Sequence, residues 1–122
     1  MPSEPLGILL ISGGHERAHY AHVIAAGAAA LGRTVVLFAT NAGCHALTPG
    51  SDEAADAAIR ATGVAGLDEL REAAAEFGVR RIACDAGLRM AGIDPIALAP
   101  GVEVAGIATF LAAIGPGQII TL

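Results

Sequence analysis

Apolar residues along this chain fall into five short runs, and between the runs apolar positions recur at helical spacing. The second run, residues 33–40, is almost wholly apolar, which is typical of a parallel strand buried on both faces. Alternating strands and helices predict an α/β fold: three α/β/α layers around a five-stranded, mainly parallel sheet, in a single domain over residues 1–122. The predicted strands are 6–12, 33–40, 79–84, 102–107 and 118–122, and the predicted helices are 15–32, 52–61, 66–78, 86–92, 95–99 and 108–115.

Short-range signals suggest where some of these elements begin. Ser51 is placed to cap the helix over 52–61, and Asp94, followed by a proline, is placed to cap the segment 95–99. The stretch NAGCHALTPG, residues 41–50, is predicted to be a loop. In a parallel sheet, functional groups gather where such loops follow the carboxyl ends of the strands.

The charge balance excludes several functions. The 122 residues carry twelve carboxylates against seven arginines, a formal charge of -5, and include no lysine. A chain without lysine has neither a Schiff-base residue nor the lysine of a phosphate-binding loop. An acidic chain with no tryptophan also lacks a basic stacking surface, so we expect no direct binding to nucleic acid.

The chain also lacks the signals of export. Its start has no basic region before the first apolar run, and its longest weakly polar stretch, VIAAGAAALG, is too short to span a bilayer. We therefore expect a cytoplasmic protein with no membrane partner. In that reducing compartment, Cys44 and Cys84 are expected to be free thiols rather than a disulfide.

Cys84 ends the third predicted strand, immediately before a predicted helix. Backbone amides and the dipole at a helix N-terminus stabilise a thiolate, whereas the neighbouring carboxylate of Asp85 disfavours it. The sequence alone leaves that balance open. The alternative is an inert, buried cysteine, which is common in protein cores.

A resemblance to a known family gives this cysteine a role. CDAGLRMAGI from Cys84 onward, then PGVEVAGIATFLAAI and QIITL, together with the first strand, helix and second strand, resemble the DsrE/DsrF/TusD-like family of sulfur-handling proteins. The most specific feature is a cysteine ending the third strand, with the pair Gly92 and Ile93 after it. The resemblance implies that Cys84 carries sulfane sulfur as a persulfide, in sulfurtransferase-type chemistry that needs no metal or organic cofactor.

The same resemblance implies partners. Sulfur would come from a donor protein and pass to an acceptor protein, and the chain would form a homo-oligomer, either a dimer, a trimer or a hexamer. Apolar residues near the end of the chain are candidates for that interface, although burial in the core of one subunit explains them equally well. These residues are Phe110, Leu111 and Ile114.

Anion binding is predicted at two places on the same edge of the sheet. The SGGH turn resembles a helix N-terminal anion site, but it lacks the full glycine pattern of a dinucleotide fold. Arg80 and Arg81 are expected on a solvated edge, far from Cys84. The candidate pocket and anion-binding residues are Gly13, Gly14, His15, Asp85, Ala86, Gly87 and Arg89.

Two further features have more than one interpretation. Cys44 is either a second, resolving thiol or an incidental cysteine. His15, His19 and His22 fall on one stripe of the predicted helix, which suggests a metal site or merely a polar face. That stripe is predicted to lie opposite an apolar side formed by Tyr20, Val23, Ile24 and Leu31. The rivals to sulfur transfer are therefore a metal- or small-anion-binding module and a structural subunit without chemistry.

Overall fold

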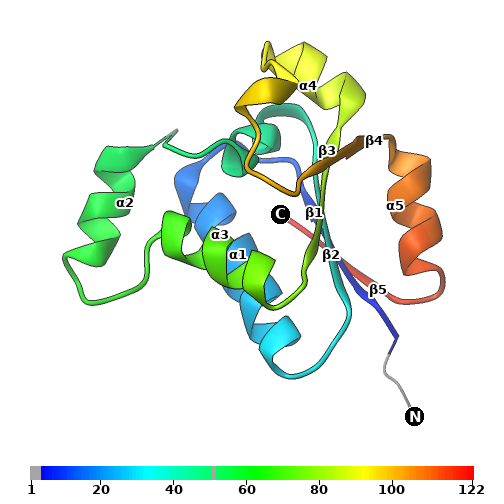
Figure 1. Ribbon diagram of the computed structural model, residues 1–122, viewed down its shortest axis with the longest axis horizontal. Coiled ribbons are helices and arrows are strands. Elements are labelled where there is room, and N and C mark those ends of the chain that lie inside the picture. Colours follow the sequence, from blue (N-terminus) through cyan, green and yellow to red (C-terminus); the bar gives the residue numbers. More distant parts are fainter. Residues whose placement is uncertain (1–3, 51) are drawn as a thin grey trace.

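The computed structural model describes residues 4–50 and 52–122. Its centre is a five-stranded, wholly parallel sheet in the order β4-β3-β2-β1-β5 (Figure 1). This confirms the predicted parallel sheet, with strands close to the predicted ranges. The strands are β1 (Leu6–Leu10), β2 (Val35–Ala39), β3 (Arg80–Cys84), β4 (Glu103–Ala105) and β5 (Gln118–Thr121).

Helices cover both faces of the sheet and confirm the three-layer fold. In Figure 1, α1 and α3 lie on one side, α5 lies on the other, and α2 projects away from the sheet. Within the described ranges, no helix combines the length and the apolar character needed to cross a membrane. The helices are α1 (His15–Ala30), α2 (Glu53–Arg60), α3 (Leu67–Glu76), α4 (Asp85–Ala91) and α5 (Ile107–Ile114), with 3-10 helices η1 (Asn41–Leu47) and η2 (Pro95–Ala97).

Side chains of β2 alternate between two apolar clusters, one on each face of the sheet. Leu37 is buried on the face covered by α1 and α3, whereas Val36 and Phe38 are buried on the face covered by α5. Phe38 stacks on Phe110 of α5, with ring centroids 5.1 Å apart. This two-sided burial explains why the sequence of β2 is apolar at every position.

The packing of α1 differs from the prediction. Tyr20 and Leu31, assigned to the apolar side, are 57% and 85% exposed, whereas His22 is fully buried. The buried face of α1 consists mainly of alanines, such as Ala21 and Ala25. Small side chains let α1 approach the sheet and α3 closely. The face that carries alanines is therefore the buried one, and the larger side chains of Tyr20 and Leu31 stay outside.

Other local predictions have mixed outcomes. The segment predicted as a loop contains η1, and Ile107, predicted at the end of a strand, is the first residue of α5. Asp94 does cap η2, since its Oδ1 accepts a hydrogen bond of 3.0 Å from the N–H of Ile96. The predicted cap at Ser51 lies outside the described residues.

The structure corrects the prediction for Arg81 and decides between the two interpretations of the apolar residues of α5. Arg80 is exposed and pairs with Glu103, but Arg81 is only 7% exposed, because successive residues of β3 face opposite sides of the sheet. Phe110 and Ile114 are buried in the core of this chain, and only Leu111 of the three interface candidates is exposed.

Truncating neighbouring residues of α5 tests this core assignment. Phe110→Ala should lower the free energy of unfolding by about 3–5 kcal/mol, because it removes the ring stacked on Phe38. Leu111→Ala, at a half-exposed position, should change it by less than about 1 kcal/mol. Urea unfolding of both variants at one protein concentration measures the difference. Equal losses would contradict the difference in burial between Phe110 and Leu111.

Candidate functional site

The carboxyl ends of β1, β2 and β3 are joined by a tightly packed turn. After β2, the chain enters η1, and the N–H of Gly43 donates to the carbonyl of Ile11 at 3.0 Å. A side chain on Gly43 would bring its Cβ within 2.3 Å of the carbonyl oxygen of Leu10. Only glycine fits this approach, so η1 lies against the end of β1.

Cys84 occupies the junction between β3 and α4. It is the N-cap of α4, and its Sγ accepts a hydrogen bond from the N–H of Gly87 at 3.4 Å. The side chain is partly exposed and packs beside the apolar cluster on the α5 face, which also includes Leu9 and Ala105 at its edge. A partly exposed cysteine here has its sulfur within hydrogen-bond distance of one backbone N–H, at the strand end before a helix where the sequence placed it.

Gly87 holds this junction close to η1. A Cβ at Gly87 would lie 2.6 Å from the backbone nitrogen of Asn41 and 2.8 Å from the hydroxyl oxygen of Thr40. Asn41 itself has a positive φ of 52°, which turns the chain at the start of η1. The N-terminus of α4 and the turn after β2 therefore fix each other's position.

The charged residues of α4 face solvent. Asp85 and Arg89 form an ion pair at 3.3 Å, with side chains 59% and 73% exposed. An exposed pair of this kind is worth at most about 1 kcal/mol, so Arg89 can exchange Asp85 for another anion at little cost. Ala86 lies with them at the exposed start of α4.

Cys44 is fully buried in η1, on the α1 side of the sheet, and Cys84 is partly exposed on the other. Burial raises the pKa of Cys44 to about 11, and the nearby charge of Cys84 adds to the effect. The Cys44 thiol donates to the carbonyl of Ala39 at 3.5 Å. At neutral pH it is protonated, which favours the interpretation of Cys44 as an incidental core residue.

The glycine turn after β1 lies in a separate place from Cys84. Gly13 and His15 line a cavity of about 270 Å3, and Gly14 is the N-cap of α1. No residue of α4 lines that cavity. His45 of η1 borders it and also borders a cavity of about 190 Å3 beside Met90, so η1 separates the two predicted anion-binding groups.

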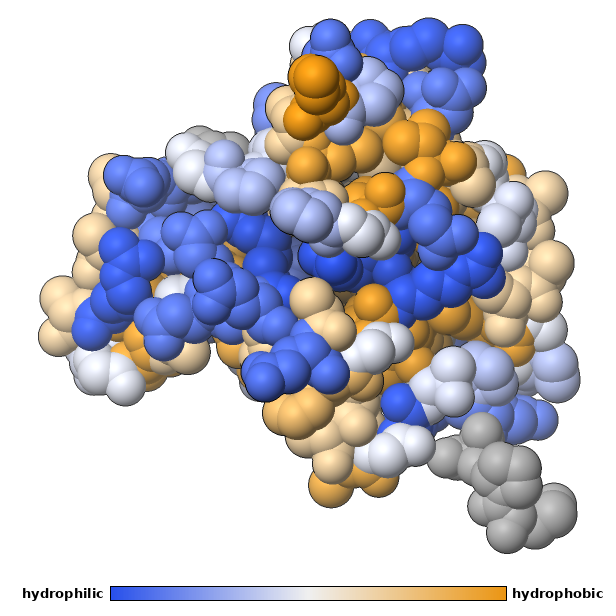
Figure 2. Space-filling view, viewed as in Figure 1, coloured by the Kyte–Doolittle hydropathy of each residue, from blue (hydrophilic) through white to orange (hydrophobic). Residues whose placement is uncertain are grey.

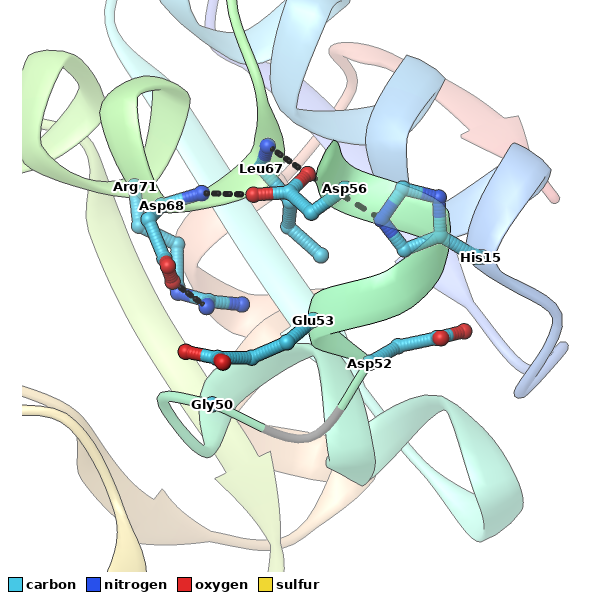
Figure 3. Close-up of a pocket in the computed structure, with 8 residues that line it drawn as sticks. All are labelled: His15, Gly50, Asp52, Glu53, Asp56, Leu67, Asp68 and Arg71. Atoms are coloured by element: carbon cyan, nitrogen blue, oxygen red, sulfur yellow. Dashed lines mark hydrogen bonds and ion pairs between the residues drawn. The ribbon is translucent and has the colours of Figure 1, made fainter. Parts of the chain in front are cut away.

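Asp56 is a buried polar residue that the sequence did not single out. Figure 3 shows its carboxylate between α1, α2 and the start of α3. It accepts hydrogen bonds from the N–H groups of Leu67 and Asp68, lies 3.2 Å from Nε2 of His15, and pairs with Arg60 at 2.8 Å. Burial alone would raise the pKa of Asp56, but these partners together hold it below its usual value.

This arrangement gives His15 a structural partner, because Asp56 joins α1 to α2 and caps α3. The one available signal was an aspartate flanked by alanines in a predicted helix. Apart from Arg60, four residues on, its partners lie at least eleven positions away in the sequence.

The three histidines of α1 each have a different environment. The ring of His15 stacks on His19, Nε2 of His19 donates to the carbonyl of Ala65, and Nδ1 of His22 donates to the carbonyl of Ala18. Across the described ranges, no three His, Cys, Asp or Glu residues are grouped to hold a metal ion. In the structure, His15 and His19 therefore contact each other, and His22 bonds within its own helix.

A sequence model of the DsrE/DsrF-like family matches residues 6–122. The solved structure of the YchN protein from E. coli is similar with a TM-score of 0.75 and 15% identity, over 100% of both chains. MTH1491 from Methanobacterium thermoautotrophicum, a protein of unknown function, is similar with a TM-score of 0.62 and 17% identity, over 98% of this chain and 100% of that one. No curated protein matched.

Substituting two glycines tests the junction at Cys84. Gly87→Ala should force α4 away from η1, lower the free energy of unfolding by about 1–3 kcal/mol, and slow alkylation of Cys84 by iodoacetamide. Gly27→Ala, within α1 and facing open space, is the control and should leave alkylation unchanged while raising stability by up to about 1 kcal/mol. Alkylation is followed by mass spectrometry of the Cys84 peptide. An unchanged rate in Gly87→Ala would contradict the role of its N–H.

His22 makes stability depend on pH. Burial lowers the pKa of His22 to about 4, against its hydrogen bond to Ala18, and the charges of Arg71 and Arg81 lower it further. Below pH 6.5 the unfolded chain therefore binds a proton that the folded chain does not, so stability falls as pH falls. Between pH 6.5 and 5, this difference at His22 should lower the free energy of unfolding by about 2 kcal/mol. Urea unfolding at several pH values measures this loss. Over the same pH range, the free energy of unfolding of His22→Leu should fall by that much less than the free energy of the wild type. Equal falls in the two proteins would refute the assignment.

Proposed function

This chain belongs to the DsrE/DsrF-like family, and from that premise we propose that it is a sulfur carrier whose Cys84 holds sulfane sulfur as a persulfide. The observation that supports this most directly is the contact between Sγ of Cys84 and the N–H of Gly87 at the start of α4. The site combines a partly exposed thiol with a backbone donor that favours negative charge on sulfur. Both the thiolate that attacks and the persulfide anion that forms carry such charge.

The proposed transfer is neutral in electrons. The Cys84 thiolate attacks the outer sulfur of a donor persulfide, a new S–S bond forms on Cys84, and the donor leaves as a thiolate. An acceptor thiolate then attacks the outer sulfur on Cys84, and Cys84 leaves as a thiolate. No metal or organic cofactor takes part, because a thiolate is both nucleophile and leaving group.

The surroundings of Cys84 suit this exchange. Cys84 is partly exposed, and the side chains of Asp85 and Arg89 just after it are exposed to solvent, where a partner protein can meet them. We propose that the exposed α4 surface is where the donor and acceptor proteins dock. Cys44 takes no part in the proposed cycle, since its buried thiol is protonated at neutral pH.

We also propose that the protein forms a homo-oligomer in the cytoplasm, where thiols stay reduced. Apolar side chains exposed on β4 and α5 support self-association. These are Val104, Ile107 and Leu111, which are 43%, 47% and 50% exposed. Packing these side chains against a second copy would remove apolar surface from water. This surface lies next to β3, the strand that ends at Cys84.

Intact-protein mass spectrometry after incubation with glutathione persulfide tests the carrier function. The wild-type protein should gain one sulfur atom, about 32 Da, that dithiothreitol removes, as persulfide chemistry requires. Cys84→Ser should gain none. Cys44→Ser, with the buried cysteine changed, is the matched control and should gain sulfur as the wild type does.

Two results would count against the carrier function. Sulfur uptake by Cys84→Ser would place the chemistry elsewhere. The second experiment adds an excess of a small thiol to the purified persulfide. If the sulfur stays on Cys84, the residue binds sulfur but does not transfer it, and the protein is not a carrier.

A further inference from the structure

Thr40 stands at the carboxyl end of β2, beside the end of β3 that carries Cys84. The last aligned pair of these two strands is Ala39 with Ala83, and Thr40 and Cys84 each follow that pair by one residue. Thr40 keeps an extended backbone, with φ -138° and ψ 165°, and its N–H donates to the carbonyl of Leu10 at 3.0 Å. The extended course of β2 therefore continues through Thr40, which makes it the neighbour of Cys84 across the two strands.

The side chains of Thr40 and Cys84 lie on the same face of the sheet. Phe38 and Ile82 are aligned, and both belong to the apolar cluster on the α5 face, which Cys84 also contacts. Because side chains alternate along an extended chain, Thr40 shares the face of Phe38, two residues earlier. Both residues also meet Gly87: its N–H donates to Sγ of Cys84 at 3.4 Å, and a Cβ on it would lie 2.8 Å from the hydroxyl oxygen of Thr40.

The hydroxyl of Thr40 does not cap the helix that it precedes. Thr40 is the N-cap of η1, a position where a threonine side chain commonly accepts a hydrogen bond from a backbone N–H, but here it makes no such bond. Among the residues that the structure describes, the hydroxyl donates only to Oδ1 of Asn41, at 3.2 Å and at the surface. A surface bond between neighbouring side chains is worth little, so the hydroxyl can exchange this acceptor for another at small cost.

The spacing of the strands decides which sulfur atom this hydroxyl can reach. Neighbouring strands lie about 4.8 Å apart, which is too far for a hydrogen bond between side chains that stand side by side. A persulfide adds a second sulfur atom about 2 Å from Sγ of Cys84. When that outer sulfur turns toward β2, it comes within hydrogen-bond distance of the Thr40 hydroxyl.

We propose that the hydroxyl of Thr40 donates a hydrogen bond to the outer sulfur of the Cys84 persulfide, while the N–H of Gly87 donates to the inner sulfur. This role of Thr40 rests on the proposed carrier function and adds a residue to it. The outer sulfur carries the charge of the persulfide anion, and hydrogen bonds to a charged acceptor are about twice as strong as those between neutral groups. Thr40 thus holds the transferable sulfur and stabilises it as an anion.

Solvent reaches this end of the molecule, so the outer sulfur needs a donor that the protein itself fixes. Figure 2 shows hydrophilic side chains over the upper part of the view, where Figure 1 places α4. Cys84 is partly exposed there, and Thr40 is half-buried. Water alone would leave the outer sulfur free to rotate about the Cβ–Sγ bond, whereas the hydroxyl of Thr40 keeps it on the side of β2.

The test compares Thr40→Val with the wild type after both proteins have been loaded with sulfur from glutathione persulfide. Valine keeps the branched shape and removes the hydroxyl. The rate at which iodoacetamide alkylates the outer sulfur, followed by mass spectrometry across a range of pH, gives the pKa of the persulfide. Because the variant lacks a donor to the anion, the midpoint of this profile should rise by about one pH unit. At a pH above both midpoints, the equilibrium ratio of Cys84 persulfide to glutathione persulfide should fall about tenfold.

Three further variants assign the effect to the hydroxyl. Thr48→Val removes the hydroxyl at the other end of η1, where it donates to the carbonyl of His45 at 2.7 Å, and should leave the midpoint unchanged. Thr40→Ser keeps a hydroxyl and should behave as the wild type does. Thr40→Ala lacks both the hydroxyl and the branched shape, and should match Thr40→Val.

Three results would count against this role, and they can be told apart. A wild-type protein that takes up no sulfur would overturn the carrier function and the role of Thr40 with it. Sulfur uptake with the same midpoint in the wild type, Thr40→Val and Thr40→Ala would overturn the role of Thr40 alone. An equal rise in the alkylation midpoint of the sulfur-free thiol would assign the hydroxyl to Sγ of Cys84 and would overturn its assignment to the outer sulfur.

Discussion

The alternation of side chains along β3 is the constraint on which the placement of Cys84 and Arg81 depends. β3 lies between β2 and β4, so both of its edges are paired, and its residues face alternately the apolar layer on one side of the sheet and that on the other. Ile82 and Cys84 face α5, whereas Arg81 faces α1 and α3. A slip of one residue in its pairing would exchange these groups, placing the arginine under α5 and the thiol under α1. Register against β2 therefore fixes which chemistry appears on which side.

The sequence was informative where a local pattern and the tertiary structure agree. Apolar runs predicted the strands because buried parallel strands need apolar side chains on both faces, as Val36 and Leu37 show in β2. The placement of Cys84 followed from a strand end before a helix, and Gly87 supplies the N–H donor that this placement implied. For these features, residues close in sequence carry the structural information.

The sequence was less informative where contacts between distant segments decide the structure. The turn η1 depends on Gly43 fitting against the carbonyl of Leu10, and no periodicity reports such a contact. His22 is buried because alanines let α1 lie close to its neighbours, and an alanine-rich helix has no strong apolar stripe to identify its inner face. Asp56 likewise becomes important only when α1, α2 and α3 have come together around its carboxylate.

The buried polar groups between α1, α3 and β3 distinguish this core from an ordinary one. Nε2 of His22 and Nε of Arg81 both lack a partner among residues 4–50 and 52–122, and the charges of Arg71 and Arg81 each act on His22. Aliphatic residues in these places would pack without leaving polar atoms unsatisfied, so the cluster costs stability that a purely structural core would keep. Local rules are broken most often at functional sites. This cluster, however, lies on the face of the sheet away from the sulfur of Cys84, so its cost falls on the stability of the fold and leaves the chemistry of the cysteine untouched.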